Sequence, residues 1–205
     1  MIRVGVVGGL WTVTLNRPDK ANSLTRAMLE GLDDVVARAG AEGARALVLT
    51  GVGRVFSAGA DLDEARAGLA TDGVWERLSG RLAALPALTI CALNGTLAGG
   101  AMGMALACDL RLAVPGAKVF YPVMKLGFLP QPSDPARLVA LVGPARASQI
   151  LMAGAKVPVE EAQGWGLIDR VVSPDMLLAE AAALAADALG ASAAHVAGIK
   201  GLIRR

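Results

Sequence analysis

Short apolar segments recur along this chain, each followed by a stretch rich in turn residues or glycine, and this pattern constrains the fold most. "ALVLTG" (46–51) precedes "VGRVFSAGADLDEARAG", and "LTICALNG" (88–95) precedes a Gly/Ala-rich stretch. A third instance combines "DLRLAV" (109–114) with "KVFYPV" (118–123). Short apolar runs bounded by turn residues are typical of buried strands. Strands that alternate with helices predict an α/β fold whose functional loops gather at one end of the strands.

The first forty residues predict a strand-strand-helix unit. "IRVGVV" and "LWTVTLN" flank Gly8-Gly9, a two-residue turn that closes an antiparallel hairpin because glycine accepts positive φ. Apolar residues then recur at helical spacing over 24–39, with Ser23 or Thr25 as the N-cap.

The last third of the chain predicts helices around one further strand, without a linker or a second domain. The expected helices are 145–154, 160–167, 174–189, which would start at Pro174, and 192–205, and the expected strand is 168–173.

Composition excludes several classes of function. The chain has 205 residues, 54% of them hydrophobic and 19% charged, which fits one compact domain. The net charge is only +2, the basic residues are scattered and aromatics are 3%, so we expect no nucleic-acid partner. No run of 18 apolar residues occurs, so no membrane span is expected. Cys91 and Cys108 lack C-x-x-C spacing, which predicts buried reduced thiols in a cytoplasmic protein without a metal site.

Two Gly/Ala-rich segments are the candidates for a functional site. Neither "VGVVGG" (4–9) nor "AGGAMG" (98–103) has the spacing of a dinucleotide or P-loop motif. "FSAGAD" (56–61) and "LAGGAM" (97–102) lie where strands are expected to lead into helices, so their free N–H groups could bind an oxyanion. Such a donor is worth about 3–4 kcal/mol in known oxyanion holes. Alternatively, both are tight turns that pack a helix onto a sheet, with Asp61 as an ordinary cap.

Considered together, these segments resemble the enoyl-CoA hydratase/isomerase (crotonase) family. The resemblance rests on five blocks in order: "LNRPDKANSL" (15–24), "VLTGVGRVFSAGADL" (48–62), "ALNGTLAGGAMGMALACDLRLA" (92–113), "KLGFLP" (125–130) and "RASQILMAGAKVPVEEAQGWGLIDRVV" (146–172). It implies a crotonase-like spiral of strand-strand-helix units over residues 1–190, and 191–205 as the start of a shortened C-terminal helical region. It also implies an acyl-CoA thioester as substrate, no cofactor beyond the coenzyme A moiety, and a homotrimer or hexamer.

The resemblance also assigns site residues. The two oxyanion donors would be the backbone amides of Ala60 and Gly100. The residues expected along the coenzyme A arm and the acyl chain are Lys20, Ala21, Ser57, Ala58, Asp61 and Leu62.

The two catalytic glutamates of the family's hydratases are missing. Their positions hold Gly103 and Val123, which would line the substrate but cannot move a proton. Because general acid–base catalysis contributes roughly 10²–10⁴-fold per group, hydration should be negligible. Isomerisation, hydrolysis or decarboxylation of an acyl-CoA is then more plausible. The alternative is a catalytically silent protein that binds acyl-CoA or supports a partner enzyme.

Asp134, just beyond "KLGFLP", is the candidate replacement for the missing acid or base. The alternative for Asp134 is helix capping, with Pro135 at the first helical position. For the other polar candidates the structural interpretation is favoured over a catalytic one. These candidates are Tyr121, Asp63, Glu64, Lys125 and His195.

Overall fold

Two sheets and surrounding helices form the molecule, which is described over residues 1–204 by a computed structural model. The larger sheet has the strand order β1-β2-β3-β5-β7-β10 and is parallel except for the antiparallel pair β1–β2. Its strands are β1 (Ile2–Val7), β2 (Leu10–Leu15), β3 (Ala46–Gly51), β5 (Leu88–Leu93), β7 (Leu110–Ala113) and β10 (Arg170–Val171).

The smaller sheet has the order β4-β6-β8-β9, with only β8–β9 antiparallel. Its strands are β4 (Val55–Ser57), β6 (Thr96–Ala98), β8 (Lys118–Phe120) and β9 (Val157–Pro158). The strands β4, β6 and β8 each follow a strand of the larger sheet closely in sequence. The alternation read from the sequence is therefore a repeated strand-strand-helix unit.

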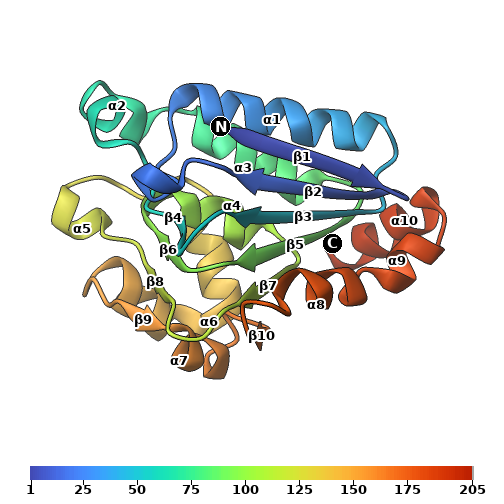
Figure 1. The fold of residues 1–205 in the computed structure, drawn as a ribbon. Helices are drawn as coiled ribbons and strands as arrows, with labels where there is room; N and C mark the ends of the chain where they lie inside the picture. The colour runs from blue at the N-terminus through green and yellow to red at the C-terminus, as the bar shows by residue number, and fades with distance from the viewer. Residues whose placement is uncertain (205) are drawn as a thin grey trace.

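Helices cover the larger sheet and close its end. Helices α1 and α3 lie along one face of the sheet, and α8 packs against β5 and β7 (Figure 1). The α-helices are α1 (Arg26–Ala41), α2 (Leu62–Arg66), α3 (Val74–Ala84), α4 (Met102–Ala107), α5 (Val123–Leu126), α6 (Asp134–Leu151), α7 (Val159–Gly164), α8 (Leu177–Leu184), α9 (Ala186–Gly190) and α10 (Ala193–Ile203). Three 3₁₀ turns are η1 (Pro18–Lys20), η2 (Leu69–Thr71) and η3 (Gly99–Ala101).

The first strand-strand-helix unit agrees with the sequence prediction. Val7 pairs with Leu10 across the two glycines, and β2 alternates buried and half-buried side chains, as expected for a strand with one face on the core. Thr25 is the N-cap of α1, and its hydroxyl accepts a hydrogen bond from the Met28 N–H at 3.2 Å.

Several expected boundaries in the second half are wrong. The helix expected over 145–154 is the last part of α6, which is interrupted at Gly143, and the helix expected over 174–189 is divided into α8 and α9. The strand expected to reach Val123 ends at Phe120, and Val123 begins the short helix α5 after Pro122. Proline has no N–H to donate to a sheet, which explains the early end. The helix expected to begin at Pro174 begins at Leu177. The expected strand over 168–173 is only two residues long.

The parallel strands give the molecule two different ends. Strands β2, β3 and β5 run towards the side on which α2 and α5 lie, whereas α9 and α10 lie near the strand starts (Figure 1).

Cys91 and Cys108 are buried and free, as predicted. Over residues 1–204, no helix is long and apolar enough to cross a membrane, and no cluster of three His, Cys, Asp or Glu is placed to hold a metal ion.

Candidate active site

The two Gly/Ala-rich loops lie against each other at the ends of β4 and β6. Gly59 and Gly99 both have positive φ, at 92° and 60°. A Cβ on Gly59 would lie 3.0 Å from the Ala98 carbonyl oxygen and 3.5 Å from the Gly100 nitrogen. The loops are therefore in backbone contact, and only glycine allows this approach.

The N–H groups of Ala60 and Gly100 take no part in the hydrogen bonds of the surrounding backbone. Ala60 bridges Leu24, and the bonds of that bridge are made by its neighbours: Leu24 N–H donates to the Gly59 oxygen at 2.8 Å and Asp61 N–H donates to the Leu24 oxygen at 2.9 Å. The Ala60 N–H therefore points away from Leu24 and has no acceptor within the described chain. Gly100 is the second residue of η3, where an N–H has no intrahelical partner.

The segment 20–24 supports the first loop. Ala58 N–H donates to the Ala21 oxygen at 3.0 Å, and the Ser57 hydroxyl donates to the Asn22 oxygen at 2.9 Å. Ser57 is fully buried, so its side chain holds the loop rather than facing solvent. The Asn22 amide donates to the oxygens of Val52 and Val55. Sequence reasoning missed Asn22, although an asparagine in the block "KANSL" is a residue type that tolerates its left-handed φ of 51°.

The side chain of Asp61 has a structural role. Its carboxylate accepts from Arg17 Nη1 at 2.8 Å and caps α2 by accepting from the Asp63 and Glu64 N–H groups. The hydrogen bond from Arg17 holds the pKa of Asp61 below its ordinary value. Sequence reasoning predicted the cap as one alternative but missed Arg17.

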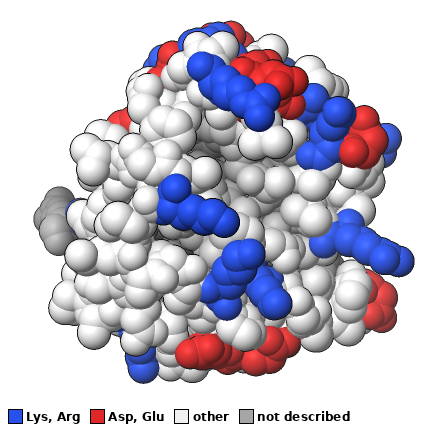
Figure 2. Space-filling model, turned by 90° about the vertical axis from the view of Figure 1, so that its left-hand side faces the viewer, with Lys and Arg blue, Asp and Glu red and all other residues white. Residues whose placement is uncertain are grey.

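The outer part of this face is open and basic. Leu62 is 73% exposed, and Lys20 and Ala58 are exposed as well. Figure 2 shows the face that carries α2 and α5, with Lys and Arg side chains around a central hollow. Lys20 and Lys125 are exposed, and within residues 1–204 neither forms an ion pair.

The carboxylate of Asp134 lies beside Gly103. A Cβ on Gly103 would be 2.9 Å from Asp134 Oδ1 and 3.2 Å from Oδ2. Asp134 is 1% exposed, and Tyr121 donates its hydroxyl proton to Oδ2 at 3.1 Å. Oδ1 has no hydrogen-bond partner in the described part of the chain. Asp134 is thus the group found next to Gly103, one of the two positions at which the resemblance implies a glutamate in hydratases.

The capping interpretation of Asp134 is wrong. Ser133 occupies the N-cap position of α6 and Asp134 is the first helical residue, with its side chain turned inward to Tyr121 instead of toward the helix N–H groups. Pro135 is therefore the second helical residue, not the first. Tyr121 is buried with its hydroxyl bonded, as the structural interpretation predicted, but its partner is the candidate carboxylate.

Burial raises the pKa of Asp134 to about 6. The Tyr121 hydrogen bond and the Arg137 guanidinium, 3.9 Å from Oδ1, act in the opposite direction, and the nearby Glu76 carboxylate raises the pKa further. Glu76 is held by the Ser133 N–H at 3.1 Å and by the Ser133 hydroxyl. A carboxyl group with a pKa near neutrality can both accept and return a proton. Glu76 and Arg137 were missed because nothing in the local sequence links them to Asp134.

Two apolar side chains lie at or beside the predicted positions. Val123 is buried at the start of α5. The Trp75 ring lies 3.2–3.3 Å from where a Cβ on Gly100 would stand, and its indole N–H donates to the Leu69 oxygen at 2.8 Å.

The other polar candidates lie outside this cluster. Asp63 pairs with Arg66 on the exposed side of α2, and Glu64 accepts from the Arg26 N–H. His195 is exposed on α10, near the starts of the parallel strands.

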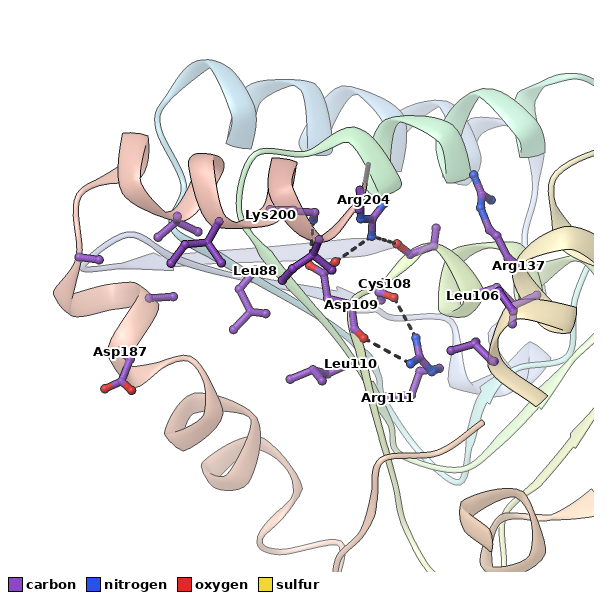
Figure 3. A pocket seen from close by; sticks show the side chains of 18 of the residues that line it. Leu88, Leu106, Cys108, Asp109, Leu110, Arg111, Arg137, Asp187, Lys200 and Arg204 are labelled. Carbon is purple, nitrogen blue, oxygen red and sulfur yellow. Dashed lines mark hydrogen bonds and ion pairs between the residues drawn. The ribbon is translucent and has the colours of Figure 1, made fainter. Parts of the chain in front are cut away.

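A cavity of about 1020 Å³ lies at that opposite end, between α10 and the starts of β5 and β7 (Figure 3). Its walls are mainly aliphatic, and three of its charged residues, Asp109, Lys200 and Arg204, form one ion-pair network. Arg137, whose guanidinium lies near Asp134, also lines this cavity. Asp109 accepts from Lys200 Nζ at 2.9 Å and from Arg204 Nη2 at 2.7 Å. Arg111 donates to the Cys108 and Leu167 oxygens. Neither Ala60 nor Gly100 lines this cavity.

Comparison with known proteins agrees with this geometry. Residues 6–205 match the family described as enoyl-CoA hydratase/isomerase. The 1,2-epoxyphenylacetyl-CoA isomerase of Escherichia coli is 34% identical over 187 residues, which cover 86% of this chain and 71% of that protein. The crystal structure of an enoyl-CoA hydratase from Bacillus anthracis is 30% identical, with a TM-score of 0.92 over 100% of this chain and 82% of that one. An enoyl-CoA hydratase/isomerase structure from Pseudoalteromonas atlantica gives the same TM-score and identity over 99% and 82%. The chain belongs to the enoyl-CoA hydratase/isomerase (crotonase) family.

Proposed function

We propose that this protein is an enzyme that isomerises an unsaturated acyl-CoA thioester. The amides of Ala60 and Gly100 would stabilise an enolate, and Asp134 would move the proton. The observation that carries the proposal is the buried Asp134 carboxylate beside Gly103 with Oδ1 unpartnered. The Escherichia coli relative is named as an isomerase of a CoA thioester, which supports isomerisation in general.

The oxyanion part of the proposal rests on hydrogen bonds that the loops do not use. Two N–H groups on loops in contact can converge on one thioester oxygen when neither has an internal acceptor. Charge develops on that oxygen when the α carbon or its vinylogous position loses a proton. Fixed donors then lower the barrier because they need no reorganisation.

The single carboxyl group favours isomerisation over hydration. In a 1,3-shift, Asp134 takes a proton from the carbon next to the double bond, the electron pair moves into the enolate, and the same carboxyl returns the proton two carbons away. Hydration needs groups that activate a water and protonate the α carbon, and Val123 supplies none. This chemistry requires no cofactor beyond the coenzyme A moiety.

Coenzyme A would lie across the basic face. Its phosphates carry several negative charges, and the exposed Lys20 and Lys125 have no ion-pair partners among residues 1–204. We further propose a homotrimer or hexamer, because Leu202 and Ile203 of α10 are 65% and 78% exposed. A cytoplasmic location would fit the free thiols.

The proposal is tested with 2-enoyl-, 3-enoyl- and saturated acyl-CoA thioesters in D₂O, with products followed by mass spectrometry. We expect interconversion of the enoyl isomers and deuterium uptake. Asp134→Asn should reduce turnover by roughly 10²–10⁴-fold and leave thioester binding intact. Asp34→Asn, the same charge change on an exposed part of α1, is the matched control.

Two outcomes would count against this proposal. The first is thioester binding without turnover or deuterium uptake for any substrate, which would instead support the catalytically silent binding protein. The second is full activity in Asp134→Asn, which would place the proton transfer elsewhere. Conversion of thioesters to free acids or to shorter products would indicate hydrolysis or decarboxylation.

A further inference from the structure

We propose that Tyr121 is the positioning residue for this chemistry: by occupying Oδ2 of Asp134, it makes Oδ1 the oxygen that exchanges the proton with substrate. This inference rests on the proposed function, and its test includes a measurement that does not need turnover. Tyr121 itself would touch no reacting atom.

The Tyr121 hydroxyl is fixed from both sides. Tyr121 follows β8 and is 4% exposed. Its oxygen accepts from the Gln131 N–H at 3.4 Å and its single proton goes to Asp134 Oδ2 at 3.1 Å. A buried hydroxyl whose acceptor side faces a backbone N–H has one direction left for its proton.

The two oxygens of Asp134 are therefore not equivalent. Oδ2 has a fixed donor, whereas Oδ1 has none among the described residues. Arg137 Nη1 is 3.9 Å from Oδ1, beyond hydrogen-bond distance, and donates to Ser79 Oγ at 2.9 Å. On the remaining side of Oδ1 is Gly103, so close that a Cβ on this residue would lie 2.9 Å from Oδ1. The free lone pairs of the carboxylate thus face the position where a hydratase of the family has a glutamate.

The charged and titratable groups around Asp134 come from three elements. Tyr121 approaches from the end of β8, Arg137 from the same helix α6, and Glu76 from α3, while α4 contributes the uncharged Gly103. A donor to the carboxylate stabilises its charged form. Loss of the Tyr121 hydroxyl should therefore raise the pKa of Asp134 above about 6.

Tyr121→Phe tests the inference because it keeps the ring and removes only the hydroxyl. The first measurement is a carbon NMR titration of the aspartate carboxyls, with Asp134→Asn to assign the signal. We expect the pKa of Asp134 to rise by about one unit. The second is the pH profile of kcat/KM. An ionised carboxylate is needed to accept the proton, so activity should fall about tenfold near pH 5 and return close to the wild-type value near pH 9.

The matched control is Phe120→Leu, which changes the preceding aromatic residue, whose ring lies under Lys156 Nζ at 5.0 Å. This variant should leave the titration of Asp134 unchanged. An identical Asp134 pKa in wild type and Tyr121→Phe would overturn the inference, and so would a loss of activity that is equal at every pH. If wild type turns over no thioester, the proposed reaction fails, and the titration still decides whether Tyr121 controls Asp134.

Discussion

The two ends of the parallel strands differ in whether their polar groups have partners. At the strand starts, Asp109 is matched by Lys200 and Arg204, and also accepts from the Thr89 N–H and hydroxyl. At the other end, Asp134 Oδ1 and the Ala60 N–H are without partners within residues 1–204. Both ends are formed by the same sheet, so the strands alone do not explain the difference.

The contrast distinguishes a carboxylate that holds the fold together, Asp109, from one that is available for chemistry, Asp134. Burial opposes ionisation of Asp109, but Lys200 and Arg204 keep its pKa below the ordinary value, so the carboxylate is a permanent anion that ties α10 to the sheet. Asp134 has a raised pKa and a free oxygen. Buried polar atoms without partners are rare and costly, and they mark the places where a ligand is expected. The large cavity at the strand starts does not contain the proposed oxyanion donors, because neither Ala60 nor Gly100 lines it.

The largest expected effect concerns the pH dependence of stability. The folded-state pKa of Asp134, about 6, exceeds the ordinary 3.8, so wild type loses stability as pH rises through this window. Asp134→Asn does not titrate there. Its free energy of unfolding relative to wild type should rise by about 3 kcal/mol between about pH 4 and pH 8. Chemical denaturation at both pH values measures this, and Asp34→Asn should show no such trend. If the free energy of unfolding of Asp134→Asn relative to wild type were the same at both pH values, burial would not raise the pKa of Asp134.

A smaller loss is expected at the other end from Asp109→Asn. This change leaves Lys200 and Arg204 without their anion and should lower the free energy of unfolding by about 2 kcal/mol, allowing for partial exposure of the carboxylate. Turnover per folded molecule should stay within about twofold of wild type, because Asp109 contacts none of the proposed catalytic groups. Urea denaturation and kcat separate the two. A large fall in kcat without loss of stability would contradict the division between the two ends.

The smallest expected effect comes from one methyl group. Gly103→Ala should favour helix α4 by propensity, but its Cβ would stand 2.9 Å from Asp134 Oδ1. We expect about a tenfold loss of turnover, the size of effect that follows from displacing a catalytic group slightly. Gly198→Ala in α10, where a Cβ meets nothing within 4 Å, is the control and should leave turnover unchanged. Equal activity of the two variants would show that Oδ1 is not the working oxygen.

Local signals predicted much of the fold. The Gly8-Gly9 hairpin, the Thr25 cap and the alternating strands all depend on residues that lie close together in the chain. The wrong boundaries have local causes as well. Pro122 ends β8 early, so Val123 lies on a helix instead of a strand.

The candidate site was less predictable because its chemistry depends on long-range packing. Asp134 follows a serine and precedes a proline, a pattern that favours a cap, yet Tyr121 from another element draws its side chain inward. The contributions of Glu76 and Arg137 arise only after α3 and α6 are packed together, and that of Asn22 only after its loop meets the segment between β3 and β4. The positions of Ala60 and Gly100 follow from the resemblance to the family, because either Gly/Ala-rich segment alone fits a tight turn at a strand-to-helix junction better.

The contact between Gly59 and Gly99 has a further consequence for how this scaffold can change. The proposed device that activates the thioester is made of peptide groups alone, so no side chain has to be kept for it. The proposed proton-transfer chemistry depends instead on side chains such as Asp134 beside Gly103, and exchanging them would alter what happens to the activated acyl group while the means of activation stays as it is. A new reaction could then arise from one or two substitutions on an unchanged main chain.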